Sequence, residues 1–194
     1  MWLRKSLAHK LVQVNQLLAP YHREIVVLDG YRPIACQRGL WDFYYRQARY
    51  VTGSADDAVL RAHAGAHVVD PSDFDRNDPR TWPAHTTGGA IDTTLRFLGT
   101  GEVADMGSCY EEITDTSHCD HFEKLLDEGV IRSDDPRLLN RRLMHWAMSA
   151  EGILNHPCVF WHHDWGNQLY VRTCMDRDLD VPRAAWYGYI DAPE

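Results

Sequence analysis

Hydrophobic residues at the start of the chain recur at three- and four-residue steps, which predicts an amphipathic helix. The apolar positions of this helix are Leu3, Leu7, Leu11, Val14 and Leu18. Pro20 ends the pattern. The β-branched run Glu24–Leu28 then predicts a short buried strand, and the turn 29–33 follows it. Because proline suits the first turn of a helix, we expect a second helix from Ile34 to about Tyr50.

The pattern changes after the second predicted helix. Residues 52–83 are rich in Gly, Asp, Pro and His, and we expect a long excursion there with at most one short helix. Connections of that length in a compact domain are usually functional or mobile. Alternating apolar and polar positions over Ala90–Leu98 predict a strand, and the segment 99–101 predicts a hairpin turn. Glu102–Met106 is then expected to return as a second strand.

The last third of the chain has clear helix signals. Ser117 is expected to cap a short helix that runs to about Asp127. Asp135 as N-cap and Pro136 at the first position predict a long helix to about Glu151. We expect the apolar stripe of this long helix to consist of Leu139, Leu143 and Ala147.

Two further strands are expected near the carboxyl end. Cys158–Trp165 and Gln168–Cys174 flank a Gly166-Asn167 turn of the kind that joins hairpin strands. Together the elements predict an α+β fold, in which helices pack against a small antiparallel sheet. With 194 residues and 44% hydrophobic content, residues 1–194 are expected to form a single domain.

Composition narrows the classes of partner. The formal net charge of −8 argues against nucleic acid as a partner, and no apolar run approaches the roughly 20 residues that span a bilayer. The amino end has the pattern of a helix rather than of a signal peptide, so a cytoplasmic location is expected. The five cysteines are odd in number and none has CxxC spacing, which predicts free and mostly buried thiols.

A histidine and an aspartate seven positions apart are the first candidates for chemistry. His85 lies in a predicted loop and Asp92 on the strand that follows, with two glycines between them that allow the side chains to converge. His162 and His163 come much later, on another predicted strand. Because adjacent strand residues point to opposite faces, only one of these two can join the same site. Alternatively, such histidines are ordinary surface or core residues.

Two imidazoles and one carboxylate suit a catalytic metal. Zinc takes such ligands and keeps an open position when it is catalytic, and iron(II) accepts the same set. Zinc is therefore the expected cofactor, with iron(II) as the alternative.

Several segments together resemble the D-alanyl-D-alanine dipeptidases, which are zinc metallopeptidases related to D-Ala-D-Ala carboxypeptidases and hedgehog-type domains. The matching segments occur in the order of the family. They are Asp29-Gly30-Tyr31-Arg32-Pro33, His85-x-x-Gly88-x-Ala90-Ile91-Asp92-x-Thr94-Leu95, Gly101-Glu102-Val103-x-x-Met106-Gly107-Ser108, Ser117-His118, Asn140-Arg141-Arg142-Leu143 and Trp161-His162.

The resemblance implies a role for several positions. His85, Asp92 and His162 match the zinc ligands of the family, and Arg32 matches the arginine that stabilises the tetrahedral intermediate. Glu111 stands where the dipeptidases have the aspartate that binds the ammonium group of the substrate. Trp161, which flanks one ligand, is expected to shield the metal and contact the substrate.

The chain departs from the family at its general base. The family has a glutamate three residues before the last zinc histidine, and this chain has Val159 there. The loss of a general base typically costs a factor of about 100 to 10,000 in rate. The candidates for a replacement are Glu111, Glu112, His118 and His163, and Glu111 is preferred. A serine of the family is also replaced, by Pro83.

Three functions are consistent with these residues. The first is a zinc hydrolase that acts on a small dipeptide-like or amino-acid-derived substrate. The second is a repurposed metalloenzyme, such as a non-haem iron(II) enzyme of specialised metabolism that uses the triad of His85, Asp92 and His162. The third is a non-catalytic metal-containing binding module.

Overall fold

The computed structural model describes residues 1–112, 114–180 and 182–191. A four-stranded antiparallel sheet lies at its centre, with the strand order β1-β2-β4-β3. The strands are β1 (Arg23–Asp29), β2 (Ala90–Phe97), β3 (Leu154–Asn155) and β4 (His162–Asp164). The helices are α1 (Lys5–Leu18), α2 (Ile34–Thr52), α3 (Asp57–His67), α4 (His121–Asp127), α5 (Pro136–Ala150) and α6 (Gln168–Asp176). The expected α+β class is confirmed.

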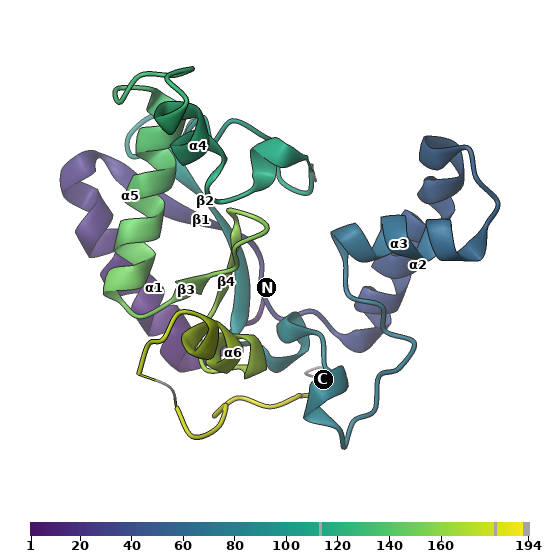
Figure 1. Cartoon of the computed structure of the whole chain (residues 1–194). Helices are drawn as coiled ribbons and strands as arrows, with labels where there is room; N and C mark the ends of the chain where they lie inside the picture. Colours follow the sequence, from purple (N-terminus) through teal and green to yellow (C-terminus); the bar gives the residue numbers. More distant parts are fainter. Residues whose placement is uncertain (113, 181, 192–194) are drawn as a thin grey trace.

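Helices α1 and α5 pack side by side against the sheet (Figure 1). The apolar stripe of α1 is buried as its spacing predicts, and it joins Ile91 and Leu95 of β2 in the main core. These strand residues are completely buried, which fixes the register of β2 against the helices. The core therefore holds rigidly the strand that carries Asp92.

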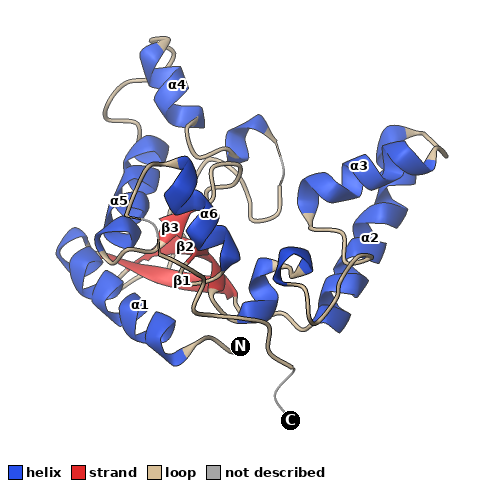
Figure 2. Ribbon diagram, turned by 60° about the horizontal axis from the view of Figure 1, so that its bottom comes forward, coloured by secondary structure: helices blue, strands red, loops and turns tan. Residues whose placement is uncertain are grey.

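Helices α2 and α3 form a pair beside the sheet body rather than on it (Figures 1 and 2). The pair has its own small hydrophobic cluster, which includes Trp41, Tyr44 and Ala64. The Asp56 side chain caps α3 by accepting hydrogen bonds from two backbone N–H groups. The short helix that was expected within residues 52–83 is therefore present.

The sheet register brings two predicted site residues together. Asp92 of β2 lies directly opposite His162 of β4. On its other side β2 pairs with β1 along most of its length, and the chain leaves β1 through the turn that carries Arg32. The four-residue 3-10 turn Ala84–Thr87, which contains His85, lies just before β2.

Two strand predictions are wrong, and a third is confirmed over part of its range only. Glu102–Met106 does not return as a strand, because its only ladder contact among the described residues is a bridge between Arg96 and Val103. Side chains of α5 bind the carbonyls at positions 105 and 106 instead. Cys158–Trp165 is a strand only over His162–Asp164.

Gln168–Cys174 is helical rather than extended, and it forms the first part of α6. The Asn167 side chain accepts a hydrogen bond from the Tyr170 backbone N–H, so it caps a helix instead of serving a hairpin turn. Strand β4 pairs with β2 along one edge and with β3 along the other. The sequence pattern did not predict β3.

The structure also corrects smaller predictions about helix caps and about the burial of individual side chains. The long helix begins after its Asp135 cap as predicted, but Leu139 is exposed and Met144 is buried in the core instead. Ser117 closes a short 3-10 turn, and α4 begins only at His121 after Asp120. The cysteines are free, but they are not mostly buried, since three of the five are exposed. Among the described residues, no helix has the length and apolar character that crossing a bilayer requires.

Candidate metal centre

His85 is oriented by the backbone of the Arg32 turn. The side chain is buried, and its Nδ1 lies 2.7 Å from the carbonyl oxygen of Gly30. Because a carbonyl oxygen only accepts, Nδ1 carries the proton of the neutral ring. The lone pair on Nε2 is then free to face the centre of the site, which is the arrangement typical of a metal-binding histidine.

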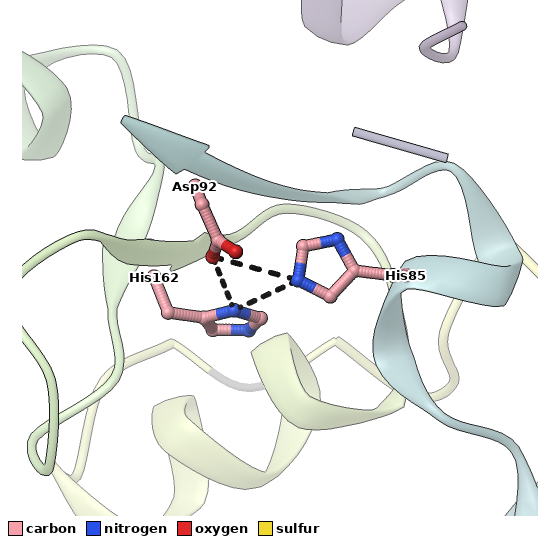
Figure 3. A group of neighbouring side chains, drawn as sticks. All are labelled: His85, Asp92 and His162. Atoms are coloured by element: carbon pink, nitrogen blue, oxygen red, sulfur yellow. Dashed lines mark hydrogen bonds and ion pairs between the residues drawn. The ribbon is translucent and has the colours of Figure 1, made fainter. Parts of the chain in front are cut away.

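Asp92 and His162 complete a tight group with His85 (Figure 3). The Asp92 Oδ1 lies 3.0 Å from the His162 Nδ1 and 3.5 Å from the His85 Nε2. The two ring nitrogens are 3.2 Å apart. All three ligand atoms therefore lie within 4.8 Å of one another, so a single cation can contact them together.

The outer partners of the group also fit a metal site. The second nitrogen of His162, Nε2, lies 3.2 Å from the Asp164 Oδ2, within ion-pair distance. Tyr110 donates a hydrogen bond of 2.9 Å to the Asp92 Oδ2. Metal-bound histidines usually give their second N–H to a carboxylate or a carbonyl oxygen. The Gly30 carbonyl oxygen is this partner for His85, and for His162 the Asp164 carboxylate lies at ion-pair distance without an aligned hydrogen bond. The donor set suits zinc or iron(II).

The charges around His85, Asp92 and His162 favour the binding of a cation between them. Burial acts to raise the pKa of Asp92, but His85 and His162 hold it well below its usual value. Burial acts to lower the pKa of His162, yet Asp164 and Asp92 raise it to about 10. A pocket that stabilises an extra proton so strongly also stabilises a metal cation at the same point.

His163 points away from this group, as strand alternation predicts. Its Nδ1 lies 2.9 Å from the Trp161 carbonyl oxygen and 3.3 Å from the Thr93 hydroxyl oxygen. The ring is only 1% exposed and lines a different cavity from the one beside the metal group. His163 is therefore not placed to replace the general base.

Arg32 lies at the edge of the group. Its Nη2 is 3.9 Å from the Asp92 Oδ2, and Asp29 holds its Nε at 2.8 Å. Its Nη1 donates to the Gln37 side-chain oxygen on α2. The guanidinium is thus fixed beside the candidate metal position and lines the adjacent pocket. In that place it can donate hydrogen bonds to an oxyanion or a carboxylate.

The pocket beside the group has a volume of about 200 Å³. Glu111 and Trp161 line it, together with Val159 and part of the α2–α3 pair. Tyr44 of α2 donates a hydrogen bond of 3.0 Å to the Glu111 Oε2. Glu111 adopts a left-handed backbone conformation, with φ of 63°, which is uncommon for a residue with a side chain.

Of the four candidates for a replacement base, Glu111 alone is among the residues that line this pocket. Glu112 is exposed and accepts a hydrogen bond from the Cys109 N–H. His118 is exposed as well. Trp161 is 4% exposed and packs edge-to-face against the Tyr110 ring, so it walls the site.

Sequence reasoning missed three residues that support the site. Asp164 follows His162 by two positions on β4, so strand alternation could have placed it on the same face. Tyr110 and Tyr44 reach the site from distant segments, and no local pattern marks them. The pocket also includes His156, whose ring lies 5.9 Å from the His162 ring between centroids.

Comparison with known proteins agrees with the family resemblance seen in the sequence. The model of the D-ala-D-ala dipeptidase family matches residues 1–180. The D-alanyl-D-alanine dipeptidase of Synechocystis sp. is 28% identical over 97% of this chain and 79% of its own length. The corresponding enzyme of Enterococcus faecalis is 23% identical over 87% of this chain and 74% of its own length.

Solved structures of vancomycin-resistance D,D-peptidases also align with the chain. VanY from a VanB-type resistance cassette, crystallised with Zn(II), has a TM-score of 0.45 and 14% identity over 91% of this chain and 80% of its own. VanYB in complex with D-alanine-D-alanine has the same TM-score and 15% identity over 91% of this chain and 78% of its own.

Proposed function

The chain belongs to the D-Ala-D-Ala dipeptidase family, and from that premise we propose that it binds one zinc ion through His85, Asp92 and His162. We propose further that it is a hydrolase-like enzyme for a small dipeptide-like or amino-acid-derived substrate. The observation that carries the proposal is the convergence of three ligand atoms within 4.8 Å, with a partner behind each histidine.

The size of the pocket supports a small substrate. Sites for drug-sized ligands usually enclose roughly 300–1,000 Å³, and this pocket encloses about 200 Å³. A dipeptide or an amino-acid derivative suits such a volume better than a longer peptide does. Trp161 and residues of the α2–α3 pair are among those that line the pocket.

Each polar residue of the pocket has a chemical task in this proposal. When bound, zinc supplies Lewis-acid polarisation of a substrate carbonyl. Arg32 donates hydrogen bonds to the oxygen that gains negative charge, and Asp29 holds the guanidinium in place. Glu111 binds a cationic amine through its carboxylate, which Tyr44 orients. Trp161 excludes water from one side of the ligand group.

In this proposal Val159 limits the rate of hydrolysis. Its apolar side chain lines the pocket at the position where the family has its general base, and valine cannot accept a proton. In our proposal Glu111 takes this task for a substrate that has no cationic amine for its carboxylate to bind. We therefore expect slow hydrolysis, lower by a factor of about 100 to 10,000 than in a site with a positioned base.

A turnover assay tests the proposal. Zinc-loaded protein is incubated with D-Ala-D-Ala and with a library of dipeptides, and the release of amino acids is followed by mass spectrometry. We expect slow turnover of a small dipeptide that disappears in Arg32→Ala, while the matched exposed variant Arg132→Ala keeps it. No turnover of any dipeptide by protein that carries stoichiometric zinc contradicts the hydrolase proposal.

The apolar side chain of Val159 also favours a second candidate, an iron(II) enzyme with the same three ligands. Such chemistry does not need a glutamate that activates water. Metal analysis of protein purified without added metal separates the two candidates. Stoichiometric iron with oxygen consumption supports the second candidate, and stoichiometric zinc without oxygen consumption rules it out.

A further inference from the structure

A second cavity lies behind strand β4, on the face opposite the candidate metal group. His162 faces the metal group, and its neighbour His163 faces this cavity. The volume is about 390 Å³, which falls within the range of small-molecule sites. Residues of α4 and α5, of β3 and of the segment after α6 line it. Helix α5 and strand β3 lie side by side there (Figure 1).

The lining of this cavity carries more positive than negative charge, since Arg141, Arg142 and Arg177 face two carboxylates, Asp120 and Glu123. Asp120 is paired with Lys124 of α4. Arg142 is paired with Glu123. Arg177 donates one hydrogen bond to the Asn155 carbonyl oxygen, and no carboxylate of the described residues lies within 4 Å of it. Arg141 is also without a carboxylate partner among the described residues. This contrasts with the formal net charge of −8 of the whole chain.

The Arg141 guanidinium is held as a fixed cation at the wall. It donates to three backbone carbonyl oxygens and lies between the rings of Phe122 and Phe160, at 4.7 and 4.2 Å from their centroids. Burial lowers its pKa to about 10, so it remains charged at neutral pH. A ligand with a negative charge therefore gains Coulomb energy on entering the cavity.

His163 provides the observation that points to a polar ligand. Its side chain is 1% exposed, and its Nε2 has no hydrogen-bond partner among the described residues. A buried polar atom without a partner costs free energy, and native structures contain few of them. A hydroxyl group suits Nε2 well, because it both donates and accepts. An ammonium group suits the cavity poorly, since Arg141 and Arg177 repel it.

We propose that this cavity is a second ligand site, which binds a small organic anion that carries a hydroxyl group. The anionic group lies against Arg177, and the hydroxyl group forms a hydrogen bond with the Nε2 of His163. The site uses none of the candidate metal ligands, so it does not depend on the function proposed above.

Isothermal titration calorimetry with glycerol 3-phosphate and with D-glycerate tests the proposal. Two further probes separate the contributions of the ligand's groups. Inorganic phosphate carries the negative charge without the hydroxylated carbon chain, and glycerol carries the hydroxyl groups without the charge. We expect saturable binding of at least one hydroxylated anion, roughly tenfold or more tighter than phosphate or glycerol. Titration of His85→Ala, which lacks one candidate metal ligand, should give the same affinity and thereby place the binding outside the metal group.

Two variants locate the ligand. Arg177→Gln should weaken binding roughly tenfold or more, because a charge-assisted hydrogen bond is lost. Arg172→Gln removes an exposed arginine from the neighbouring turn of α6, and it should leave the affinity unchanged. Nitrogen NMR of the histidine rings in the wild-type protein should show a shift at the His163 Nε2 on saturation, which avoids any substitution in the buried strand.

Several results overturn the proposal. One is the absence of saturable binding of either hydroxylated anion at millimolar concentration. Others are equal weakening by Arg177→Gln and Arg172→Gln, loss of binding in His85→Ala, and saturation without a change at the His163 ring.

Discussion

The two sides of the pocket differ in how firmly the chain holds their polar groups. On the sheet side, His85 and Asp92 are buried and His162 is half-buried, and each has a partner behind it, such as Gly30 for His85 and Tyr110 for Asp92. On the opposite side, α2 contributes two polar contacts to the site among the described residues: Tyr44 donates to Glu111, and the Gln37 side-chain oxygen accepts from Arg32. The sheet side is preorganised for a cation. On the helical side, we expect substitutions to change the affinity for the substrate without changing the affinity for the metal.

The position of Val159 sharpens this contrast. It lines the pocket but contributes no polar side-chain atom. In our proposal it occupies the position where the family resemblance implies a glutamate, so the chain keeps the arrangement for metal binding without that base. The consequence is that metal affinity and hydrolytic rate should respond to different substitutions. The predictions below separate the two, and they run from the largest expected effect to the smallest.

Val159→Glu should give the largest change. A carboxylate at this position can accept a proton beside the candidate metal, and a positioned general base contributes a factor of about 100 to 10,000. We expect D-Ala-D-Ala hydrolysis by zinc-loaded protein to increase within that range. Val159→Gln is the matched control, because it has nearly the same shape without the base. Equal rates in the two variants contradict the assigned role of this position.

His162→Ala should abolish stoichiometric zinc binding. Loss of a partner behind a ligand already costs roughly 10–100-fold in affinity, so loss of a ligand should cost more. Competition with a zinc-sensitive dye measures the change. His9→Ala, which removes an exposed histidine from α1, should bind zinc like the wild type. Retention of tight binding in His162→Ala excludes His162 as a ligand.

Asp164→Asn should weaken zinc binding by roughly 10–100-fold. The substitution removes the negative charge that lies 3.2 Å from the His162 Nε2. The same dye competition gives the affinity, and the exposed variant Asp134→Asn should leave it unchanged. If Asp164→Asn binds zinc like the wild type, Asp164 has no part in orienting the ligand.

Tyr44→Phe should affect the substrate side alone. It removes the hydrogen bond to Glu111, and one such bond is worth about 1 kcal/mol, or roughly fivefold in affinity. Calorimetry with D-Ala-D-Ala should therefore show binding weaker by about that factor, with zinc affinity unchanged. Tyr45→Phe is the control on the same helix, since Tyr45 bonds to Asp57 at the surface. A change in zinc affinity in Tyr44→Phe means that the two sides are not separable.

The fold was predictable where a periodic hydrophobic pattern extends over many residues. The α1 stripe and the β2 alternation each gave the correct element, because packing on the core follows directly from that spacing. The Gly166-Asn167 pair suggested a hairpin turn and therefore a strand after it, yet the Asn167 side chain caps a helix at that point. The segment 102–106 pairs with β2 only through the bridge between Arg96 and Val103, and side chains of α5 bind the carbonyls at positions 105 and 106. Those side-chain contacts have no local signal in the sequence.

The candidate site was predictable only in part. His85 and Asp92 converge as their pattern indicated, because two glycines lie between them. Strand alternation allowed only one of His162 and His163 in the site, and the resemblance implied His162, which is the one that joins the group. Glu111 does line the pocket, as the resemblance implied. Tyr110 and Tyr44 could not be found, since their contacts join segments that only the folded chain brings together.

The most direct test of the central claim is a crystal structure of zinc-loaded protein with anomalous scattering recorded at the zinc edge. The account predicts one anomalous peak, bound by the His85 Nε2, the Asp92 Oδ1 and the His162 Nδ1, with an open position toward the pocket that Val159 lines. No peak between these three side chains, or rings of His85 and His162 that point to separate regions, contradicts it.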